Sequence, residues 1–159
     1  IETSEKKKTL SNLWIELMSL KKDNYKSSDK KIMNFAINLA ENNKYFTGTN
    51  PSVGCVIVKN NKILSFATTN NGGRPHAESI ALNKNRYNKG ASLYSTLEPC
   101  SHHGITPPCT NTIIKNKVKR VYYSIEDKDL RTFNKTKKIL KSKKIVTISG
   151  LQKRDVKNL

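Results

Sequence analysis

The sequence holds 159 residues, and its 30 basic against 12 acidic side chains give a formal net charge of +18 at pH 7. This length suits one domain with a sizeable core, and the absence of a long apolar run or a secretory leader pattern leads us to expect a cytoplasmic protein without membrane contact. Three cysteines do not make a disulfide framework, and the excess charge is mostly lysine rather than arginine clustered with aromatic residues, so specific nucleic-acid binding is not expected.

The chain begins with a basic extension over residues 1–28, in which apolar side chains recur at roughly helical spacing. We expect this extension to pack against the domain or against a second copy of the chain. Asp29 is then predicted to cap a helix over residues 30–43, whose apolar positions share one face. The domain is predicted to span residues 29–150, and a short tail follows over residues 151–159.

A hairpin is expected after the first helix. The apolar run 53–58 is typical of a buried strand, and residues 60–61 (Asn-Asn) predict a turn into a second strand over residues 62–68. Cys55 lies inside the first strand and is interpreted as a core residue. Further helices are expected over residues 76–86, 107–117 and 132–141, and further strands over residues 92–97, 120–125 and 145–149. This alternation predicts a layered α/β domain with a mostly parallel sheet after the hairpin.

Two short motifs carry the expected chemistry. His76 stands two residues before Glu78 at the start of an expected helix, and Cys100 and Cys109 follow downstream in a proline-rich context. One His and two Cys offer three ligands to a tetrahedral Zn²⁺ and leave its fourth position for water, as catalytic zinc sites require. His-x-Glu followed by Pro-Cys and a second Cys is a signature of zinc-dependent deaminases of bases.

The expected helix starts support this interpretation. Cys109 at a helix N-terminus favours the thiolate that a metal binds. Glu78 is predicted to accept the proton of the attacking water, to deliver it to a ring nitrogen and then to protonate the departing ammonia. The alternative is a closed structural zinc site with His102 or His103 as the fourth ligand, which would leave Glu78 without a role.

From about residue 30 to residue 150 the sequence resembles a known family, the deaminase domain of the bifunctional riboflavin biosynthesis deaminase/reductase. This domain is the diaminohydroxyphosphoribosylaminopyrimidine deaminase of the cytidine deaminase-like superfamily. The resemblance rests on the stretches that begin at Asn50 (NPSVGCVIV), Pro75 (PHAE) and Thr96 (TLEPCSHHGITPPC). The eight residues between Cys100 and Cys109 are a specific feature, because most nucleoside, tRNA and nucleic-acid deaminases have a much shorter spacer there.

The resemblance implies a cytidine deaminase-like three-layer sandwich with a central five-stranded mixed sheet flanked by helices. It implies Zn²⁺ bound by His76, Cys100 and Cys109, with Glu78 as the catalytic proton shuttle. The implied reaction is hydrolytic deamination of 2,5-diamino-6-(5-phosphoribosylamino)pyrimidin-4(3H)-one to 5-amino-6-(5-phosphoribosylamino)uracil and ammonia. The resemblance implies that Asn50 and His102 contact the substrate. Further substrate contacts are expected from Thr106, Asp129 and Arg131.

Several positions depart from the family pattern. Thr69 stands where the family usually has a His, and Ile105 stands where a Lys or Arg is expected near the substrate phosphate. The Asp-Pro-Asn-Pro motif of the family is replaced by residues 127–130 (DKDL). We expect Arg131 or Lys128 to replace the missing cation at the phosphate.

Three interpretations stay open at this point. They are the riboflavin-pathway deaminase acting on a small phosphoribosylated pyrimidine, a deaminase of another base, nucleoside or nucleic acid, and a non-catalytic zinc module. The spacing of Cys100 and Cys109 favours the first interpretation, and Glu78 argues against the third. The reductase half is absent from this sequence, so both a separate reductase partner and a longer parent chain stay open. The sequence does not decide whether the chain forms a homo-oligomer.

Overall fold

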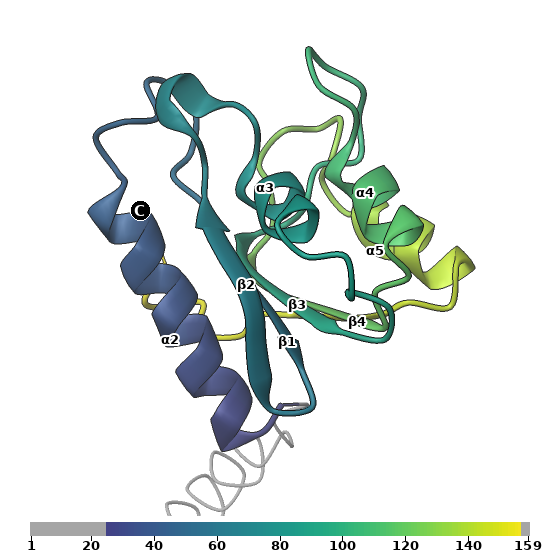
Figure 1. The fold of residues 1–159 in the computed structure, drawn as a ribbon. Coiled ribbons are helices and arrows are strands. Elements are labelled where there is room, and N and C mark those ends of the chain that lie inside the picture. The colour runs from purple at the N-terminus through teal and green to yellow at the C-terminus, as the bar shows by residue number, and fades with distance from the viewer. Residues whose placement is uncertain (1–24, 157–159) are drawn as a thin grey trace, which may run out of the picture.

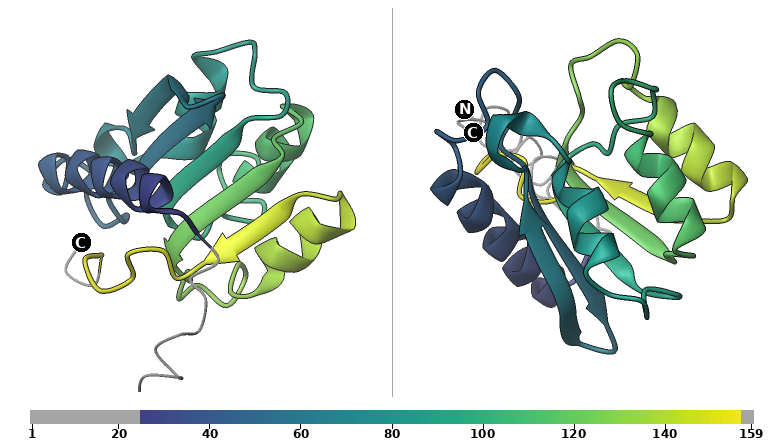
Figure 2. Two further views of the ribbon diagram at one scale, coloured as in Figure 1. Left: turned by 90° about the horizontal axis from the view of Figure 1, so that it is seen from below. Right: turned by 45° about the horizontal axis from the view of Figure 1, so that its top comes forward.

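A five-stranded mixed sheet forms the centre of the computed structural model, which describes residues 25–156 (Figure 1). Its strands are β1 (Gly54–Lys59), β2 (Lys62–Thr68), β3 (Ser92–Leu97), β4 (Arg120–Ile125) and β5 (Val146–Ser149). Their order across the sheet is β2-β1-β3-β4-β5, and β5 lies at one edge, where it is yellow in Figure 2. β1 is antiparallel to both β2 and β3, whereas β3, β4 and β5 are parallel. The predicted hairpin followed by a parallel sheet is confirmed.

The hairpin turns at the predicted pair of asparagines. Asn60 and Asn61 both have positive φ, at 51° and 59°. Such a pair is typical of the two-residue turns that match the twist of antiparallel strands, and Asn tolerates this conformation better than most residues. Cys55 is fully buried within β1, as expected for a core residue.

One face of the sheet is covered by α2 (Ser27–Asn42), which lies apart from the other helices in Figure 1. Met33 and Ala36 on this helix are fully buried. The helix approaches β1 so closely that a Cβ on Gly54 would lie 1.9 Å from the carbonyl oxygen of Ala36. A residue without a side chain is therefore required at this position.

The start of α2 differs from the prediction. Lys26 is the N-cap, and Asp29 is the third residue of the helix rather than its cap. The Asp29 carboxylate accepts a hydrogen bond from the Lys26 backbone N–H at 2.7 Å and another from the Tyr94 hydroxyl at 2.6 Å. An acidic side chain at this position satisfies a backbone donor of the first turn. Asp29 therefore closes the helix start and joins it to β3.

The opposite face carries α3 (Ala77–Asn83), α4 (Cys109–Lys115) and α5 (Lys135–Ser142), as the two views of Figure 2 show. The larger apolar core lies beneath these helices and includes Ile57, Leu82, Leu93, Ile113, Val121, Tyr123 and Leu140. Helices on both faces of the sheet complete the three-layer sandwich, and the implied cytidine deaminase-like architecture is confirmed.

These three helices are shorter than predicted. His76 and Pro108 are the N-caps of α3 and α4, so α3 begins one residue later than predicted and α4 begins two residues later. α5 begins only at Lys135, because Asn134 before it adopts a left-handed φ of 58° that a right-handed helix does not accommodate. The shorter helices place both metal-binding motifs at helix starts.

The two ends of the chain bear on the predicted boundaries. Nearly all of the extension over residues 1–28 lies outside the described residues, so its packing stays a prediction. In the tail, Leu151 and Val156 are buried in the cluster between the sheet and α2. No helix between residues 25 and 156 is both long enough and apolar enough to cross a membrane.

Candidate metal centre

The candidate site lies beyond the carboxyl ends of β3 and β4, the usual position of ligands in α/β sheets. The Glu98 backbone N–H donates to the Ile125 carbonyl oxygen at 2.9 Å, which aligns the two strand ends. Cys100 follows, and its carbonyl oxygen accepts the Thr110 backbone N–H at 3.2 Å. This contact fixes the loop after β3 against the first turn of α4.

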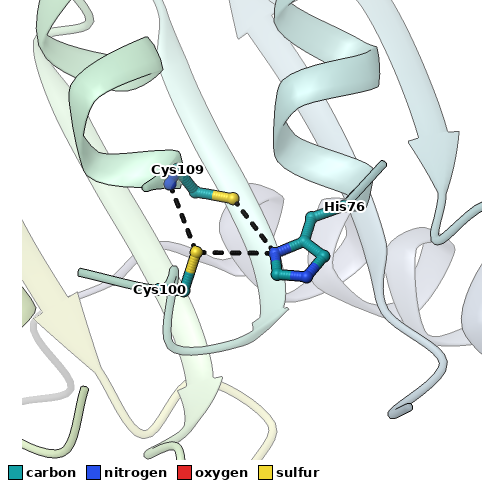
Figure 3. Close-up of side chains that lie close together, drawn as sticks. All are labelled: His76, Cys100 and Cys109. Atoms are coloured by element: carbon teal, nitrogen blue, oxygen red, sulfur yellow. Dashed lines mark hydrogen bonds between the residues drawn. The ribbon is translucent and has the colours of Figure 1, made fainter. Parts of the chain in front are cut away.

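His76, Cys100 and Cys109 converge at this place (Figure 3), and one donor atom from each lies within 4.8 Å of the other two. The Nδ1 atom of His76 is 3.5 Å from the Cys100 Sγ atom and 3.4 Å from the Cys109 Sγ atom. The Cys109 backbone N–H donates to the Cys100 Sγ atom at 3.2 Å. The structure therefore brings together the three predicted ligands.

The two sulfurs have unequal proton affinities. A hydrogen bond from Cys109, together with contacts to the His76 ring and the Cys109 backbone N–H, holds the pKa of the Cys100 thiol well below its usual range. The same contact with Cys100, together with burial, raises the pKa of the Cys109 thiol. Cys100 is therefore the more acidic of the two thiols, whereas the helix start had led us to expect the thiolate at Cys109. A metal that binds both sulfurs must displace the proton of Cys109.

This donor set fits Zn²⁺. One imidazole nitrogen and two thiolates are preferred zinc ligands, and three protein ligands leave one position open, as in catalytic sites. No further His, Cys, Asp or Glu between residues 25 and 156 belongs to the group. The Nδ1 atom of His102 contacts the Thr132 Oγ1 atom at 2.8 Å, and His103 is exposed. The closed structural site with one of these histidines is therefore not formed.

Glu78 lies beside the metal group in the first turn of α3 and is 3% exposed. Its Oε1 atom accepts the Ser95 hydroxyl at 3.2 Å, and its Oε2 atom is 3.6 Å from the Cys109 Sγ atom. Burial, followed by the negative charge of Cys100, raises the pKa of the Glu78 carboxyl. A bound dication would lower this pKa again. The carboxyl is thus placed where it can both take up and give back a proton.

A pocket of about 220 Å³ extends from this group. Its walls include His76, Glu78, Cys100 and four of the predicted substrate contacts, namely Asn50, His102, Asp129 and Arg131. The fifth, Thr106, is not part of the wall. It accepts a hydrogen bond at 3.0 Å from Nη1 of Arg74, which does line the pocket.

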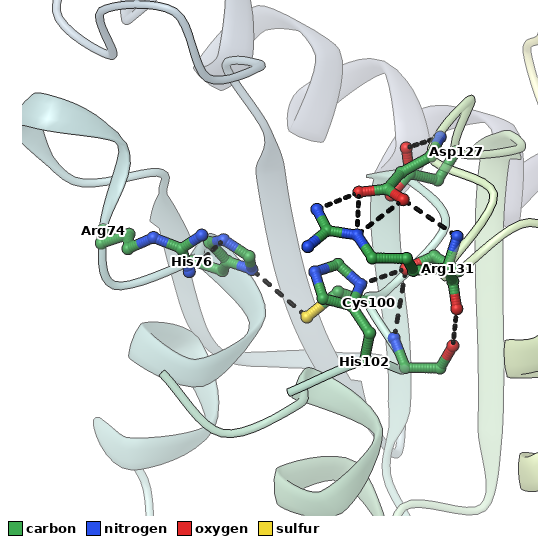
Figure 4. A network of polar contacts seen from close by, with 9 residues as sticks. Arg74, His76, Cys100, His102, Asp127 and Arg131 are labelled. Carbon is green, nitrogen blue, oxygen red and sulfur yellow. Dashed lines mark hydrogen bonds and ion pairs between the residues drawn. The ribbon is translucent and has the colours of Figure 1, made fainter. Parts of the chain in front are cut away.

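The side of the pocket that holds His102 carries a polar network (Figure 4). Nε of Arg131 donates to both carboxylate oxygens of Asp129, at 2.9 and 3.0 Å. This pairing holds the pKa of Asp129 well below its usual range. The Asp129 backbone N–H in turn donates to the Asp127 carboxylate at 2.9 Å. Arg131 is therefore an ion-paired residue and not a free cation.

The departures from the family pattern have different structural outcomes. The Thr69 hydroxyl accepts the Val53 backbone N–H at 3.0 Å and donates to the Pro51 carbonyl oxygen at 3.2 Å, so it fixes one wall of the pocket. The Ile105 side chain is 88% exposed. Lys128 lines a separate hollow. Of the two cations expected to replace the missing one, only Arg131 lines the pocket.

Three charged residues of the pocket wall were not predicted as site residues, namely Arg74, Glu98 and Asp127. Glu98 is 1% exposed, and its carboxylate accepts the Asp127 backbone N–H at 3.2 Å. Burial is the main cause that raises the pKa of both carboxyls. Glu98 lies two residues before Cys100, and Asp127 lies two residues before Asp129, so both could have been found from their place in the sequence. Arg74 could not, because its contact is with Thr106 in a distant loop.

Comparison with known proteins agrees with this geometry. The family described as the cytidine and deoxycytidylate deaminase zinc-binding region matches residues 26–125. The riboflavin biosynthesis protein RibD of Aquifex aeolicus is 47% identical over 100 residues, which are 62% of this chain and 28% of that protein. The diaminohydroxyphosphoribosylamino-pyrimidine deaminase of Buchnera aphidicola is 39% identical over 128 residues, which are 80% of this chain and 87% of that relative.

A solved structure gives the same picture. The diaminohydroxyphosphoribosylaminopyrimidine deaminase/5-amino-6-(5-phosphoribosylamino)uracil reductase of Thermotoga maritima is 34% identical and superimposes with a TM-score of 0.76, covering 82% of this chain and 38% of that one. The chain thus spans 28% and 38% of these two longer relatives but most of the Buchnera protein.

Proposed function

The chain belongs to the cytidine and deoxycytidylate deaminase zinc-binding family, and we propose that it deaminates a phosphoribosylated diaminopyrimidine. The substrate is 2,5-diamino-6-(5-phosphoribosylamino)pyrimidin-4(3H)-one, and the products are 5-amino-6-(5-phosphoribosylamino)uracil and ammonia. The relative named for this deaminase, which the chain matches over 87% of its length, supports this choice of substrate.

One observation carries the proposal: a buried carboxylate lies against a metal group that has only three protein donors. The Oε2 atom of Glu78 is 3.6 Å from the Cys109 Sγ atom, and both belong to helix starts that face each other. Hydrolytic deamination requires a metal with an open position and a proton carrier within reach of the same water. A closed structural site would need neither feature.

Each residue of the centre then has a role. His76, Cys100 and Cys109 hold the zinc ion, which supplies Lewis acidity and lowers the pKa of water toward about 7. Glu78 accepts a proton from the water that attacks the amine-bearing ring carbon and delivers it to the adjacent ring nitrogen. Glu78 then takes up the proton of the hydroxyl group that this addition has placed on the carbon and gives it to the amine. The bond between the carbon and the amine breaks, the carbon–oxygen double bond forms, and the amine leaves as ammonia. Ser95 orients the carboxylate through its hydroxyl.

The remaining pocket residues are assigned to substrate binding. Asn50 and His102 lie on the pocket wall and offer hydrogen-bonding groups to the ring and the ribose. Asp129 and Arg131 line the pocket as an ion pair. Thr106 acts indirectly, because it binds the side chain of a lining arginine.

A reductase partner and a cytoplasmic location belong to the same proposal. The Thermotoga relative is named for a reductase as well as a deaminase, and the chain covers 38% of it. The reductase activity is therefore expected from a further part of this protein or from a separate partner. Metal-binding thiols must stay reduced, which fits a cytoplasmic location.

Ammonia release from the diaminopyrimidinone ribosyl phosphate by zinc-loaded protein tests the proposal. Glu78→Gln is the matched control, because it keeps the size of the side chain and removes its ability to carry a proton. Cytidine, adenosine and single-stranded oligonucleotides are tested in parallel. Release from the diaminopyrimidinone by the native protein alone supports the proposal, whereas release only from a cytosine or adenine substrate would replace the substrate assignment.

A further inference from the structure

The charge distribution in the pocket leaves one arginine without a carboxylate partner. The pocket has two arginines in its walls, Arg74 and Arg131. Arg131 forms an ion pair with Asp129, whereas no carboxylate of residues 25–156 forms an ion pair with Arg74. A guanidinium that no carboxylate contacts directly can bind an anion of the ligand, although Glu78, Glu98 and Asp127 line the same pocket farther away.

The loop between Cys100 and Cys109 contacts Arg74 and holds it in place. Its Nη1 atom donates to the Thr106 Oγ1 atom at 3.0 Å. The same group lies against Gly104, where even an added Cβ would stay 3.7 Å from the Arg74 Nη2 atom. Ile105, between these two residues, turns its side chain to solvent and is 88% exposed. The guanidinium therefore packs beside Gly104 and Thr106 of this loop.

The contact of Arg74 with His76 depends on the metal. The Nη1 atom of Arg74 is 3.4 Å from the Nε2 atom of His76, whose Nδ1 atom faces both ligand sulfurs. A guanidinium only donates hydrogen bonds, so Nε2 must be unprotonated to accept one. If Nδ1 held a metal, the ring proton would lie on Nε2, which could then not accept from Arg74. The hydrogen bond to Thr106 does not depend on the tautomer of His76.

From these observations we propose that Arg74 binds the phosphate group of the substrate and determines the preference for a phosphorylated pyrimidine. This inference rests on the proposed function. A guanidinium presents several N–H groups in one plane, which suits two phosphate oxygens at once. Arg131, which was expected in this role, is instead held by Asp129.

The test compares the phosphorylated substrate with its dephosphorylated ribosylamino counterpart. Arg74→Gln removes the charge but can still donate to Thr106. We expect it to lower kcat/KM for the phosphorylated substrate by about 10- to 150-fold, the effect of losing hydrogen bonds to a charged group. We expect no such loss for the dephosphorylated compound. Lys128→Gln, which removes a charge outside the pocket, is the matched control and should leave both values unchanged.

A binding measurement separates this inference from the proposed function. Calorimetry on the zinc-loaded protein uses ribose 5-phosphate and ribose as probes, and Arg74→Gln should abolish the preference for the phosphorylated sugar. If that preference is lost while no ammonia is released by the native protein, the proposed reaction fails and the role of Arg74 stands. If Arg74→Gln keeps the preference, or if Arg131→Gln alone loses it, the inference is overturned even where the native protein deaminates its substrate.

Discussion

Gly72 and Gly73 offer a matched pair of substitutions that tests how the loop before α3 shapes the pocket. Both residues have positive φ, at 75° and 90°, so alanine is strained at either position by about 1–2 kcal/mol. A Cβ on Gly72 would meet no atom within 4 Å. A Cβ on Gly73 would lie 2.1 Å from the Nδ2 atom of Asn50 and 2.5 Å from its Cγ atom.

The difference between the two alanine variants therefore isolates the displacement of Asn50. Ordinary contacts between heavy atoms are about 3.5–4.0 Å, so the Asn50 side chain must retreat by more than about 1 Å in Gly73→Ala. Losing one neutral hydrogen bond of about 0.5–1.5 kcal/mol to the substrate predicts a fall in kcat/KM of about 2- to 13-fold. Gly72→Ala should lower the free energy of unfolding but leave kcat/KM unchanged.

The assay is kcat/KM from ammonia release, measured beside urea unfolding for both variants. Asn50→Ala should reproduce the fall in kcat/KM seen for Gly73→Ala, and combining the two substitutions should lower kcat/KM little further, because both remove the same substrate contact. The combination stays strained, since the Cβ atom of Asn50, which alanine keeps, would lie 2.6 Å from the added Cβ. Equal kcat/KM values for Gly72→Ala and Gly73→Ala would refute the reasoning. So would an Asn50→Ala variant with native kcat/KM.

Three further predictions concern the centre and its support. Glu78→Gln should keep native zinc content, measured by elemental analysis, and lose about 10²- to 10⁴-fold in turnover, and retained turnover would contradict its role as proton carrier. Mass spectrometry after treatment with iodoacetamide should find no modified cysteine in the zinc-loaded protein and modified Cys100 after chelation, because the pKa of its thiol is low. Cys109 and Cys55 are buried and have raised pKa values, so they should react more slowly, and modification of Cys55 before unfolding would contradict the fold. Asp29→Ala should lower the free energy of unfolding in urea by about 2–4 kcal/mol, and Tyr94→Phe by about 1 kcal/mol. The double variant should lose less than the sum, and additive losses would show that the two side chains do not interact.

The strands were predictable because their signals are local. Residues 62–68, 92–97 and 120–125 form strands over their full predicted ranges, since each is rich in strand-forming residues and bounded by turns or loops. Helix starts were less predictable. An acidic side chain can stabilise a helix either as its cap or within its first turn, so the sequence alone does not give the first residue of the helix. In the structure, the hydrogen bond from the Tyr94 hydroxyl helps to hold Asp29 within the first turn of α2. That partner is 65 residues away in the sequence.

The metal centre was predictable from spacing, whereas the charge distribution around it was not. His76, Cys100 and Cys109 stand in motifs whose residue types and order already indicate one metal. The pairing of Arg131 with Asp129 lies within three residues of chain, so the sequence contained a signal for it. The place of Arg74 follows from its contact with Thr106 across 32 residues, which only the packing of the two loops reveals.

We propose that this chain deaminates a phosphoribosylated diaminopyrimidine by hydrolysis at the zinc centre. Incubation of the zinc-loaded protein with the substrate in ¹⁸O-labelled water, followed by mass spectrometry of the pyrimidine product, tests it most directly. We expect the native protein to give one labelled oxygen at the carbon that carried the amine and one equivalent of ammonia. The Glu78→Gln variant should give neither labelled product nor ammonia. An unchanged substrate, despite a full complement of bound zinc, would contradict the account.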